Sequence, residues 1–408
     1  MGLFRQANTL LAGVGCAGTL LLCACAHEPR PRADSVHAPP HRSPPEAVAS
    51  WLGQADRIVE QGVFRHVFPG AVLAVGTSAE LVHLRPFGRL TYDAGSDAVR
   101  TDTVYDLASL TKVVATTAAA AVLVDDGRLR LDTRVTSLQS CFSGESKDVV
   151  SIRDLLTHSA GLPASATLYR EAGDRAAALD RTCRMDLDYE PGTKSVYSDL
   201  SMDLLAATIE QVTGERLDAA AATLVFRPLG MNDTLFRPSA ALRPRIAPTE
   251  NNTWRGRMLR GEVHDDNAYA MGGVAGHAGL FGTAPDLARF AQMMLNRGSF
   301  DGKRIVSAET VDLFTRRCDV PGSGRALGWN MVDEWAGSFW SERAYGHTGV
   351  TGTMIWIDPE YDAFMVLLTN SVYPKYSGDT FRRLRRDVGD AVISAVRMQR
   401  QPPRKPAS

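Results

Sequence analysis

The chain has 408 residues, of which 44% are hydrophobic and 22% are charged, and its formal net charge is −1. These values match ordinary soluble globular proteins and exclude fibrous, disordered and polytopic membrane proteins. The balanced charge supplies no basic field that would gather nucleic acid, so we expect no nucleic-acid partner. A chain of this length is expected to bury one large core or to form two closely packed lobes.

The N-terminal segment has the features of a targeting signal. Arg5 precedes an apolar run over about residues 10–22, which is too short for a comfortable membrane span but has the length of a signal-peptide core. The run ends in Leu22-Cys23-Ala24-Cys25, which resembles a bacterial lipoprotein signal. On this resemblance residues 1–25 are a signal peptide with a lipobox, and Cys25 is the lipidated first residue of an exported, membrane-anchored protein facing the periplasm. Plain secretory cleavage, which would give a soluble periplasmic or secreted protein, is the alternative.

Residues 26–45 are rich in proline and poor in apolar residues, a composition that stays extended and predicts a tether. The cysteines beyond it, Cys141, Cys183 and Cys318, are odd in number and lack CxxC or metal-ligand spacing. We therefore predict no disulfide framework, although one pair among the three is possible in an oxidising compartment.

The folded body is predicted to start with a helix and a hairpin. Over residues 46–61 the apolar residues recur every three or four positions, which indicates an amphipathic helix that covers a sheet. Two aliphatic runs, 70–76 and 81–84, follow with turn residues between them and predict a β-hairpin.

Residues 105–124 form the most informative stretch, because small and aliphatic residues on every side predict a fully buried helix. Ser109 is near its first turn, where free backbone N–H groups favour a developing negative charge. Lys112 lies on the same face at i+3, and an ammonium buried there must pair or lose its proton. The two residues are therefore a candidate nucleophile and its activator. A helix-capping Ser109 with an exposed Lys112 is the alternative, since this spacing alone occurs often by chance.

A second hairpin over residues 352–369 and an amphipathic helix over 379–398 are predicted near the other end, before a disordered tail at 399–408. Strands at both ends with helices beside them predict an α/β fold, in which an antiparallel sheet is flanked by N- and C-terminal helices. A mainly helical lobe, about 110–295, is inserted into it, and residues 46–398 form one folding unit.

Three segments in order carry a family resemblance: Ser109-Leu-Thr-Lys112, Tyr197-Ser-Asp199 and His347-Thr-Gly349. They resemble the SxxK, Tyr-x-Asn and Lys/His-Thr-Gly elements of class C-type serine β-lactamases, D-Ala-D-Ala peptidases and related esterases. The stretches 263–268 and 276–281 look like the penicillin-binding protein 4B branch. The resemblance covers most of the chain after the tether. It implies a β-lactamase/transpeptidase-like fold and a serine hydrolase that needs no cofactor.

The resemblance also implies roles. Ser109 would attack the carbonyl of a peptidoglycan peptide, an ester or a β-lactam and form an acyl-enzyme, while Tyr197, in contact with Lys112, passes the proton to the leaving group. The oxyanion hole would use the N–H groups of Ser109 and Val350. His347 completes the catalytic set. Three further residues are assigned to substrate binding: Asp199, Thr348 and Gly349.

Two residues depart from the family pattern. His347 stands where lysine is common, and because imidazole is mostly neutral at pH 7 we expect weaker binding of anions there. His-Thr-Gly occurs in D-Ala-D-Ala peptidases, which favours a peptidase-like enzyme. Asp199 stands where asparagine is common, and its charge would raise the pKa of a nearby Lys112. Our hypothesis is that Lys112 stays an ammonium and that the phenolate of Tyr197 is the base.

The histidines at 158, 264 and 277 lack HxH, HxxxH or HExxH spacing, so we predict no metal site. We expect His158 to make a structural hydrogen bond in a turn, and His264 and Asp265 either to border the substrate cleft or to tether a loop. The predicted activity is that of a D-Ala-D-Ala carboxypeptidase-like or esterase-like hydrolase. A true class C-type β-lactamase and a catalytically silent peptidoglycan-binding envelope protein are the alternatives.

Overall fold

The computed structural model describes residues 49–400 apart from 145, 333–335 and 376–378. The predicted signal peptide with Cys25, the tether at 26–45 and residues 401–408 of the predicted tail lie outside the described residues. All elements below belong to one compact unit, Ser43–Ser408. Among the helices that the structure describes, none combines the length and the apolarity needed to cross a bilayer.

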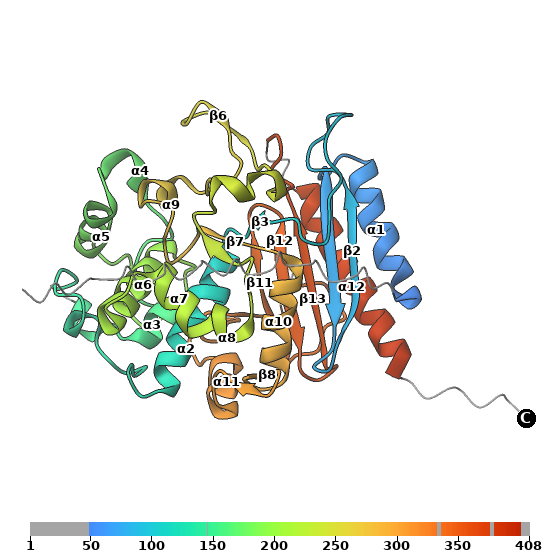
Figure 1. Cartoon of the computed structure of the whole chain (residues 1–408). Helices are drawn as coiled ribbons and strands as arrows, with labels where there is room; N and C mark the ends of the chain where they lie inside the picture. Colours follow the sequence, from blue (N-terminus) through green and yellow to red (C-terminus); the bar gives the residue numbers. More distant parts are fainter. Residues whose placement is uncertain (1–48, 145, 333–335, 376–378, 401–408) are drawn as a thin grey trace, which may run out of the picture. The chain divides into compact units, whose positions relative to one another are not determined.

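A six-stranded antiparallel sheet forms the centre of the fold, with strand order β10-β11-β12-β13-β1-β2. Both predicted hairpins are present, and their strands lie next to each other because β1 pairs with β13, with Leu73 opposite Leu367. The strands therefore join the two ends of the body, as Figure 1 shows. Their bounds are β1 Gly70–Gly76, β2 Leu81–Gly88, β10 Asn330–Met331, β11 Tyr345–Gly349, β12 Thr353–Asp358 and β13 Ala363–Thr369.

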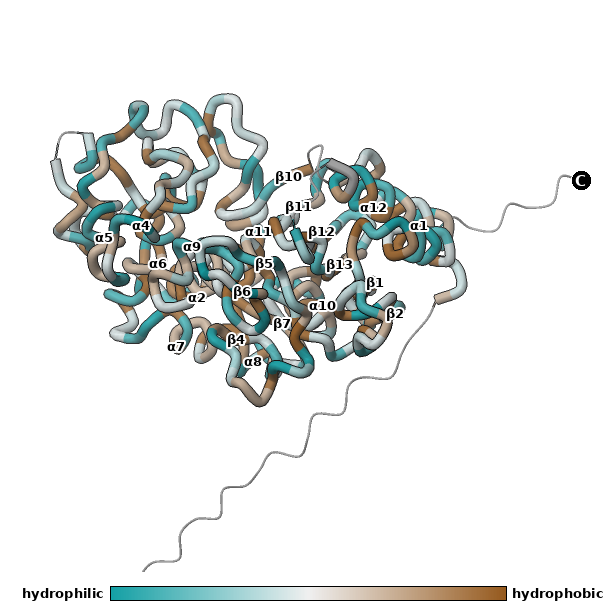
Figure 2. Tube along the Cα trace, turned by 90° about the horizontal axis from the view of Figure 1, so that it is seen from above, coloured by the Kyte–Doolittle hydropathy of each residue, from teal (hydrophilic) through white to brown (hydrophobic). Residues whose placement is uncertain are grey.

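Both faces of the sheet are covered, so β1 is buried along its whole length. Alternate side chains point to opposite faces. Ala71, Leu73 and Val75 join the core beneath α1 (Gly53–Phe64) and α12 (Asp379–Arg400), whereas Val72 and Ala74 join the other core. Figure 2 shows α1 and α12 side by side, with teal and brown residues along α12.

The predicted flanking helices are thus confirmed, with shifted bounds. The first is a short 3-10 turn, Ser50–Leu52, followed by α1, which ends three residues beyond the predicted residue 61. On the opposite face α10 (Ala284–Leu295) packs on β13, β1 and β12. This helix lies inside the range predicted for the inserted lobe, but it belongs to the layers of the sheet.

The inserted region is mainly helical (Figure 1). Its helices are α2 Ala118–Asp125, α3 Ile152–Leu156, α4 Leu168–Glu171, α5 Arg175–Arg184, α6 Asp199–Thr213, α7 Leu217–Ala221, α8 Arg227–Leu229 and α9 Asp266–Ala270. Small antiparallel strands accompany them: β3 Tyr105–Asp106, β4 Leu235–Phe236 and β7 Leu280–Gly282 in one sheet, and β5 Asn251–Asn252 with β6 Arg257–Met258 in another. The hairpin of β8 Ser299–Phe300 and β9 Lys303–Arg304 leads from α10 to α11 Ala308–Thr315.

Two of the three cysteines in the described part of the chain form a disulfide. Cys141 and Cys183 form a disulfide that closes 42 residues of the helical region, and Cys318 is a half-buried free thiol within the described part of the chain. The one pair that the sequence allowed is therefore present.

Candidate active site

The candidate nucleophile follows a constrained turn. The predicted helix over 105–124 is wrong at its start, because Tyr105 and Asp106 form strand β3, paired with β7. The chain then turns at Ala108, whose φ of 48° lies in the left-handed region that non-glycine residues rarely adopt. The helix begins at Leu110, directly after Ser109, and Lys112–Thr117 form a π-helical part within it.

Asp106 holds this turn, and sequence reasoning missed it. Its side chain is buried, and its two oxygens accept the backbone N–H of Ala108 at 2.8 Å and of His264 at 2.6 Å. Burial is the main reason that the pKa of Asp106 is raised. An aspartate side chain often accepts the backbone N–H two residues later and so holds a turn. In the sequence, the spacing of Asp106 and Ala108 is the only indication of this turn.

Lys112 is fully buried, and its ammonium has three acceptors. Nζ lies 3.0 Å from Ser109 Oγ, 3.0 Å from the carbonyl oxygen of His277 and 2.8 Å from Asp199 Oδ1. Burial acts to lower the pKa of Lys112, but the charge of Asp199 and the interactions with Asp199 and Tyr197 outweigh it and raise that pKa above its usual range. The expected effect of Asp199 on Lys112 is confirmed, and Lys112 is an ammonium at neutral pH.

Tyr197 lies among cationic and aromatic groups. The Lys112 ammonium and the Arg325 guanidinium each lie 4.9 Å from its ring centre. The rings of His158 and His347 lie at 4.8 and 5.7 Å. His158 has a φ of 55°, and its Nδ1 accepts the N–H of Ser198, which caps helix α6. The predicted structural hydrogen bond of His158 is confirmed, and it holds the residue that follows Tyr197.

The end of β11 lies against the serine turn. A Cβ on Gly349 would meet the carbonyl oxygen of Leu107 at 2.7 Å, so only glycine permits this approach. Two hydroxyls beyond it hold the same contact: Thr351 Oγ1 donates to the carbonyl of Asp106 at 2.7 Å and Thr353 Oγ1 to that of Leu107 at 3.0 Å. Val350, whose side chain is exposed, therefore lines the same cavity as Ser109.

His347 is buried on β11, next to Thr348. Its Nδ1 is 2.8 Å from the carbonyl oxygen of Thr348, which makes this nitrogen the donor. Burial, followed by the charges of Lys112 and Arg325, lowers the pKa of His347 to about 3. The imidazole is therefore neutral at pH 7, as the sequence predicted.

Ser109, Tyr197, His347 and Val350 border one cavity of about 420 Å³, a size typical of ligand sites. Three of the side chains that border it are arginines, and none of the described residues of its lining is a carboxylate. Asp199, expected at the substrate, instead contacts Lys112 and does not line this cavity. The lining residues are Ser109, Tyr197, Arg325, Asn330, His347, Thr348, Gly349, Val350, Phe381, Arg382 and Arg385.

Comparison with known proteins assigns the family. The family model described as Beta-lactamase matches residues 55–389. The chain belongs to the β-lactamase family. A Bacillus subtilis (strain 168) protein named N-acetylmuramyl-L-alanine amidase is 36% identical over 357 residues, covering 78% of this chain and 80% of that protein. An Escherichia coli (strain K12) protein named putative D-alanyl-D-alanine carboxypeptidase is 34% identical over 359 residues, covering 78% and 82%.

The fold agrees with this family. A crystal structure of a penicillin-binding protein homolog from Caulobacter crescentus superimposes with a TM-score of 0.69 at 20% identity, covering 86% of this chain and 98% of that chain. The protein is thus a serine hydrolase of the β-lactamase family. Ser109, Tyr197 and the segment from His347 to Val350 lie far apart in the sequence of this β-lactamase-family hydrolase, but they line one cavity. Lys112, one helical turn after Ser109, contacts both Ser109 Oγ and the ring of Tyr197.

Proposed function

We propose that this hydrolase transfers acyl groups through Ser109 and acts on peptides that end in a free carboxylate, as a D-Ala-D-Ala carboxypeptidase does. The observation that carries the proposal is the cavity beside Ser109, where Arg325, Arg382 and Arg385 supply positive charge. His347 is neutral there and supplies none. These three arginines, which we call the arginine wall, favour an anionic group such as the terminus of a peptide over a neutral ester, because a guanidinium is always charged.

The proton inventory of Lys112 supports Tyr197 as the base. A lysine ammonium has three N–H bonds, and all three have an acceptor within 3.0 Å, one of them Ser109 Oγ. Since its pKa is also raised, Lys112 holds its proton while Ser109 loses one. In the proposed reaction the phenolate of Tyr197 takes the proton of Ser109 as Oγ attacks the peptide carbonyl.

The remaining steps complete the proposed reaction. In the proposed reaction the N–H groups of Ser109 and Val350 stabilise the negative oxygen of the tetrahedral intermediate, and losing one such donor typically costs on the order of 100-fold to 1000-fold in rate. Tyr197 then gives its proton to the leaving amine, which departs as the terminal amino acid. Water hydrolyses the ester on Ser109 and restores the enzyme.

Labelling tests the nucleophile. A fluorescent penicillin and a fluorophosphonate are incubated with wild type and with Ser109→Ala, and we expect label on wild type alone. Unlabelled wild type would favour a catalytically silent binding protein. Rapid turnover of nitrocefin without a lasting penicilloyl-enzyme would favour a true β-lactamase.

A matched pair of peptides tests the substrate class. One ends in D-Ala-D-Ala with a free carboxylate, and the other carries a C-terminal amide at the same position. We expect wild type to cleave the acid and Arg325→Gln to lose about 10-fold or more in kcat/KM for it, since charge-assisted hydrogen bonds are worth roughly 1.5–3 kcal/mol. Equal cleavage of acid and amide by wild type would refute recognition of the carboxylate and favour an esterase-like enzyme.

Export is a further part of the proposal. The predicted signal at residues 1–25 and the disulfide between Cys141 and Cys183, which forms in oxidising compartments, support it. Mass spectrometry of the mature N-terminus tests it: a lipidated Cys25 supports the membrane anchor, and an unmodified N-terminus nearby supports plain secretion.

A further inference from the structure

One acceptor of the Lys112 ammonium is a backbone carbonyl, that of His277. The segment that carries it is packed tightly. Thr116 Oγ1 donates to the carbonyl of Gly276 at 2.7 Å, and a Cβ on Gly276 would meet the carbonyl oxygen of Met202 at 1.9 Å. The position of the His277 carbonyl therefore depends on the contacts that the side chain of His277 makes.

The ring of His277 is held between two carboxylates. Its Nδ1 lies 2.8 Å from Asp203 Oδ1 and its Nε2 lies 3.0 Å from Asp265 Oδ1, and Asp203 Oδ1 also accepts the N–H of Gly276 at 2.9 Å. Only an imidazolium donates from both nitrogens. Burial acts to lower the pKa of His277, but Asp203, Asp265 and Asp199 raise it well above 6.5. His277 and Asp203 are buried, whereas 34% of the Asp265 side chain is exposed.

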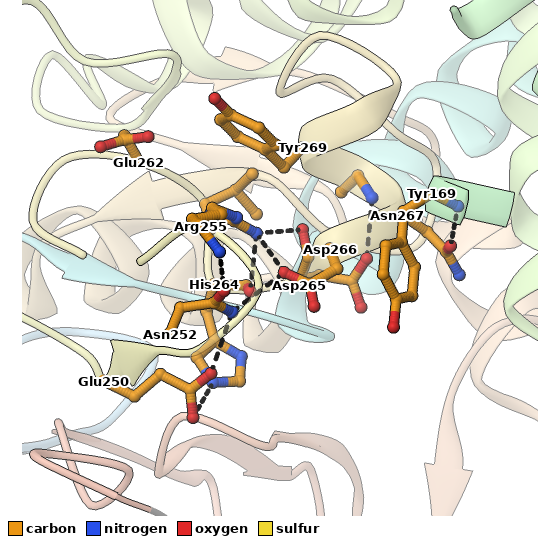
Figure 3. A network of polar contacts seen from close by, with 12 residues as sticks. Tyr169, Glu250, Asn252, Arg255, Glu262, His264, Asp265, Asp266, Asn267 and Tyr269 are labelled. Atoms are coloured by element: carbon orange, nitrogen blue, oxygen red, sulfur yellow. Dashed lines mark hydrogen bonds and ion pairs between the residues drawn. The ribbon is translucent and has the colours of Figure 1, made fainter. Parts of the chain in front are cut away.

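Asp265 is itself placed by a clamped loop, which Figure 3 shows. The guanidinium of Arg255, with only 2% of its side chain exposed, donates to the carbonyl oxygens of Val263, His264 and Asp265 at 2.6, 3.1 and 3.1 Å and to Asp266 Oδ1 at 2.8 Å. Asp265 Oδ1 also accepts the N–H of Ala268 and caps α9. The same loop donates the N–H of His264 to Asp106, the residue that holds the Ser109 turn.

We propose that Asp203, His277 and Asp265 form a positioning device for Lys112. The two carboxylates fix the ring of His277, the ring fixes the carbonyl of the same residue, and that carbonyl aims the ammonium so that one of its N–H bonds points at Ser109 Oγ. None of the three residues contacts the reacting atoms. Only the rate arm of the test below rests on the proposed function, because the first arm observes Lys112 without any substrate.

The first arm measures the Lys112 ammonium by ¹H–¹⁵N NMR and assigns its signal by its loss in Lys112→Arg. A buried ammonium with three acceptors exchanges its protons slowly, and in His277→Gln we expect exchange at least about 10-fold faster because one acceptor is no longer fixed. Lys147 is an internal reference, since its buried ammonium donates to the carbonyl of Cys183 at 2.8 Å. An unchanged Lys112 signal in folded His277→Gln overturns the proposal, whether or not the protein acylates.

His83→Gln is the matched control. His83 is also buried and its Nε2 lies 2.8 Å from Asp56, but it is a residue of β2 that contacts α1 on the far side of the sheet. We expect both histidine variants to lose stability and only His277→Gln to change the Lys112 signal. If His277→Gln fails to fold, Asp265→Ala removes one acceptor of the ring, and the same faster exchange is expected.

The second arm measures acylation by penicillin under single-turnover conditions. Misplacing a reacting group typically costs about 10-fold to 100-fold in rate, so we expect such a loss at saturating penicillin in His277→Gln. The half-saturating concentration should stay within about twofold, because the arginine wall is intact. A changed half-saturating concentration with an unchanged rate would contradict the positioning role. Failure of wild type to acylate would refute the proposed function. The NMR arm would then decide by itself whether His277 positions Lys112.

Discussion

Asp199→Asn tests which group is the base. Asp199 Oδ1 lies 2.8 Å from Lys112 Nζ, and asparagine can still accept that hydrogen bond without the charge. An opposite charge this close typically shifts a pKa by roughly 1–3 units, which is roughly 1.4–4 kcal/mol. Losing it should therefore lower the pKa of Lys112 by that amount. If the ammonium is required, the basic limb of the acylation profile moves down by about 1–3 pH units.

The assay is the rate of single-turnover acylation by fluorescent penicillin from pH 5 to 11. Asp180→Asn, which removes the charge of an exposed carboxylate paired with Arg184, is the control and should leave the profile unmoved. A neutral Lys112 acting as base predicts the opposite result, because a lower pKa would supply more free amine and raise the rate at pH 7. A faster Asp199→Asn at neutral pH, or a basic limb that stays in place, would therefore refute the assignment to Tyr197.

Two further predictions concern stability. The pKa of buried His347 is about 3 in the folded chain, against about 6.5 when unfolded, so its contribution is present above pH 6.5 and is lost as the pH falls towards 3. Relative to His347→Gln, wild type should lose about 1.4 kcal/mol of unfolding free energy per pH unit in that window, measured by urea titration, and parallel pH dependences would contradict this. Cys141→Ser removes the disulfide that closes a 42-residue loop and should lower the free energy of unfolding by about 2–4 kcal/mol. Cys318→Ser, which removes a free thiol, should lower it little. Equal midpoints of thermal unfolding for the two variants would contradict this prediction.

The sequence predicted the layers of the fold well because periodicity reports burial directly. The two hairpins and the flanking helices follow from the alternating and the three-to-four spacing of apolar residues. The pairing of Leu73 with Leu367 shows that the two hairpins lie next to each other in the sheet. The start of the central helix was missed, since the small, apolar residues around Leu107 suit a buried strand and a buried helix equally.

The site was predictable only where residues form motifs. Ser109, Lys112 and Tyr197 could be grouped by order and type, and the effect of Asp199 on Lys112 followed from its charge. Arg325 and Asp203 carry no local pattern. The stretch 276–281, which contains His277, carries a family resemblance but does not show which residues His277 contacts, because its partners lie far away in the chain. Asp203 and His277 are 74 residues apart, and only the packing of α6 against the 276–277 segment brings them together.

The left-handed turn at Ala108 sets stability against function. A residue with a Cβ in that conformation costs roughly 1–2 kcal/mol, a cost that glycine would avoid. Ala108→Gly would thus relax the fold and widen the range of backbone conformations open to the residue before Ser109. A chain selected only for thermodynamic stability would be expected to carry glycine at position 108. The alanine restricts the backbone next to the serine, so this short turn favours a rigid attacking group over maximal resistance to unfolding.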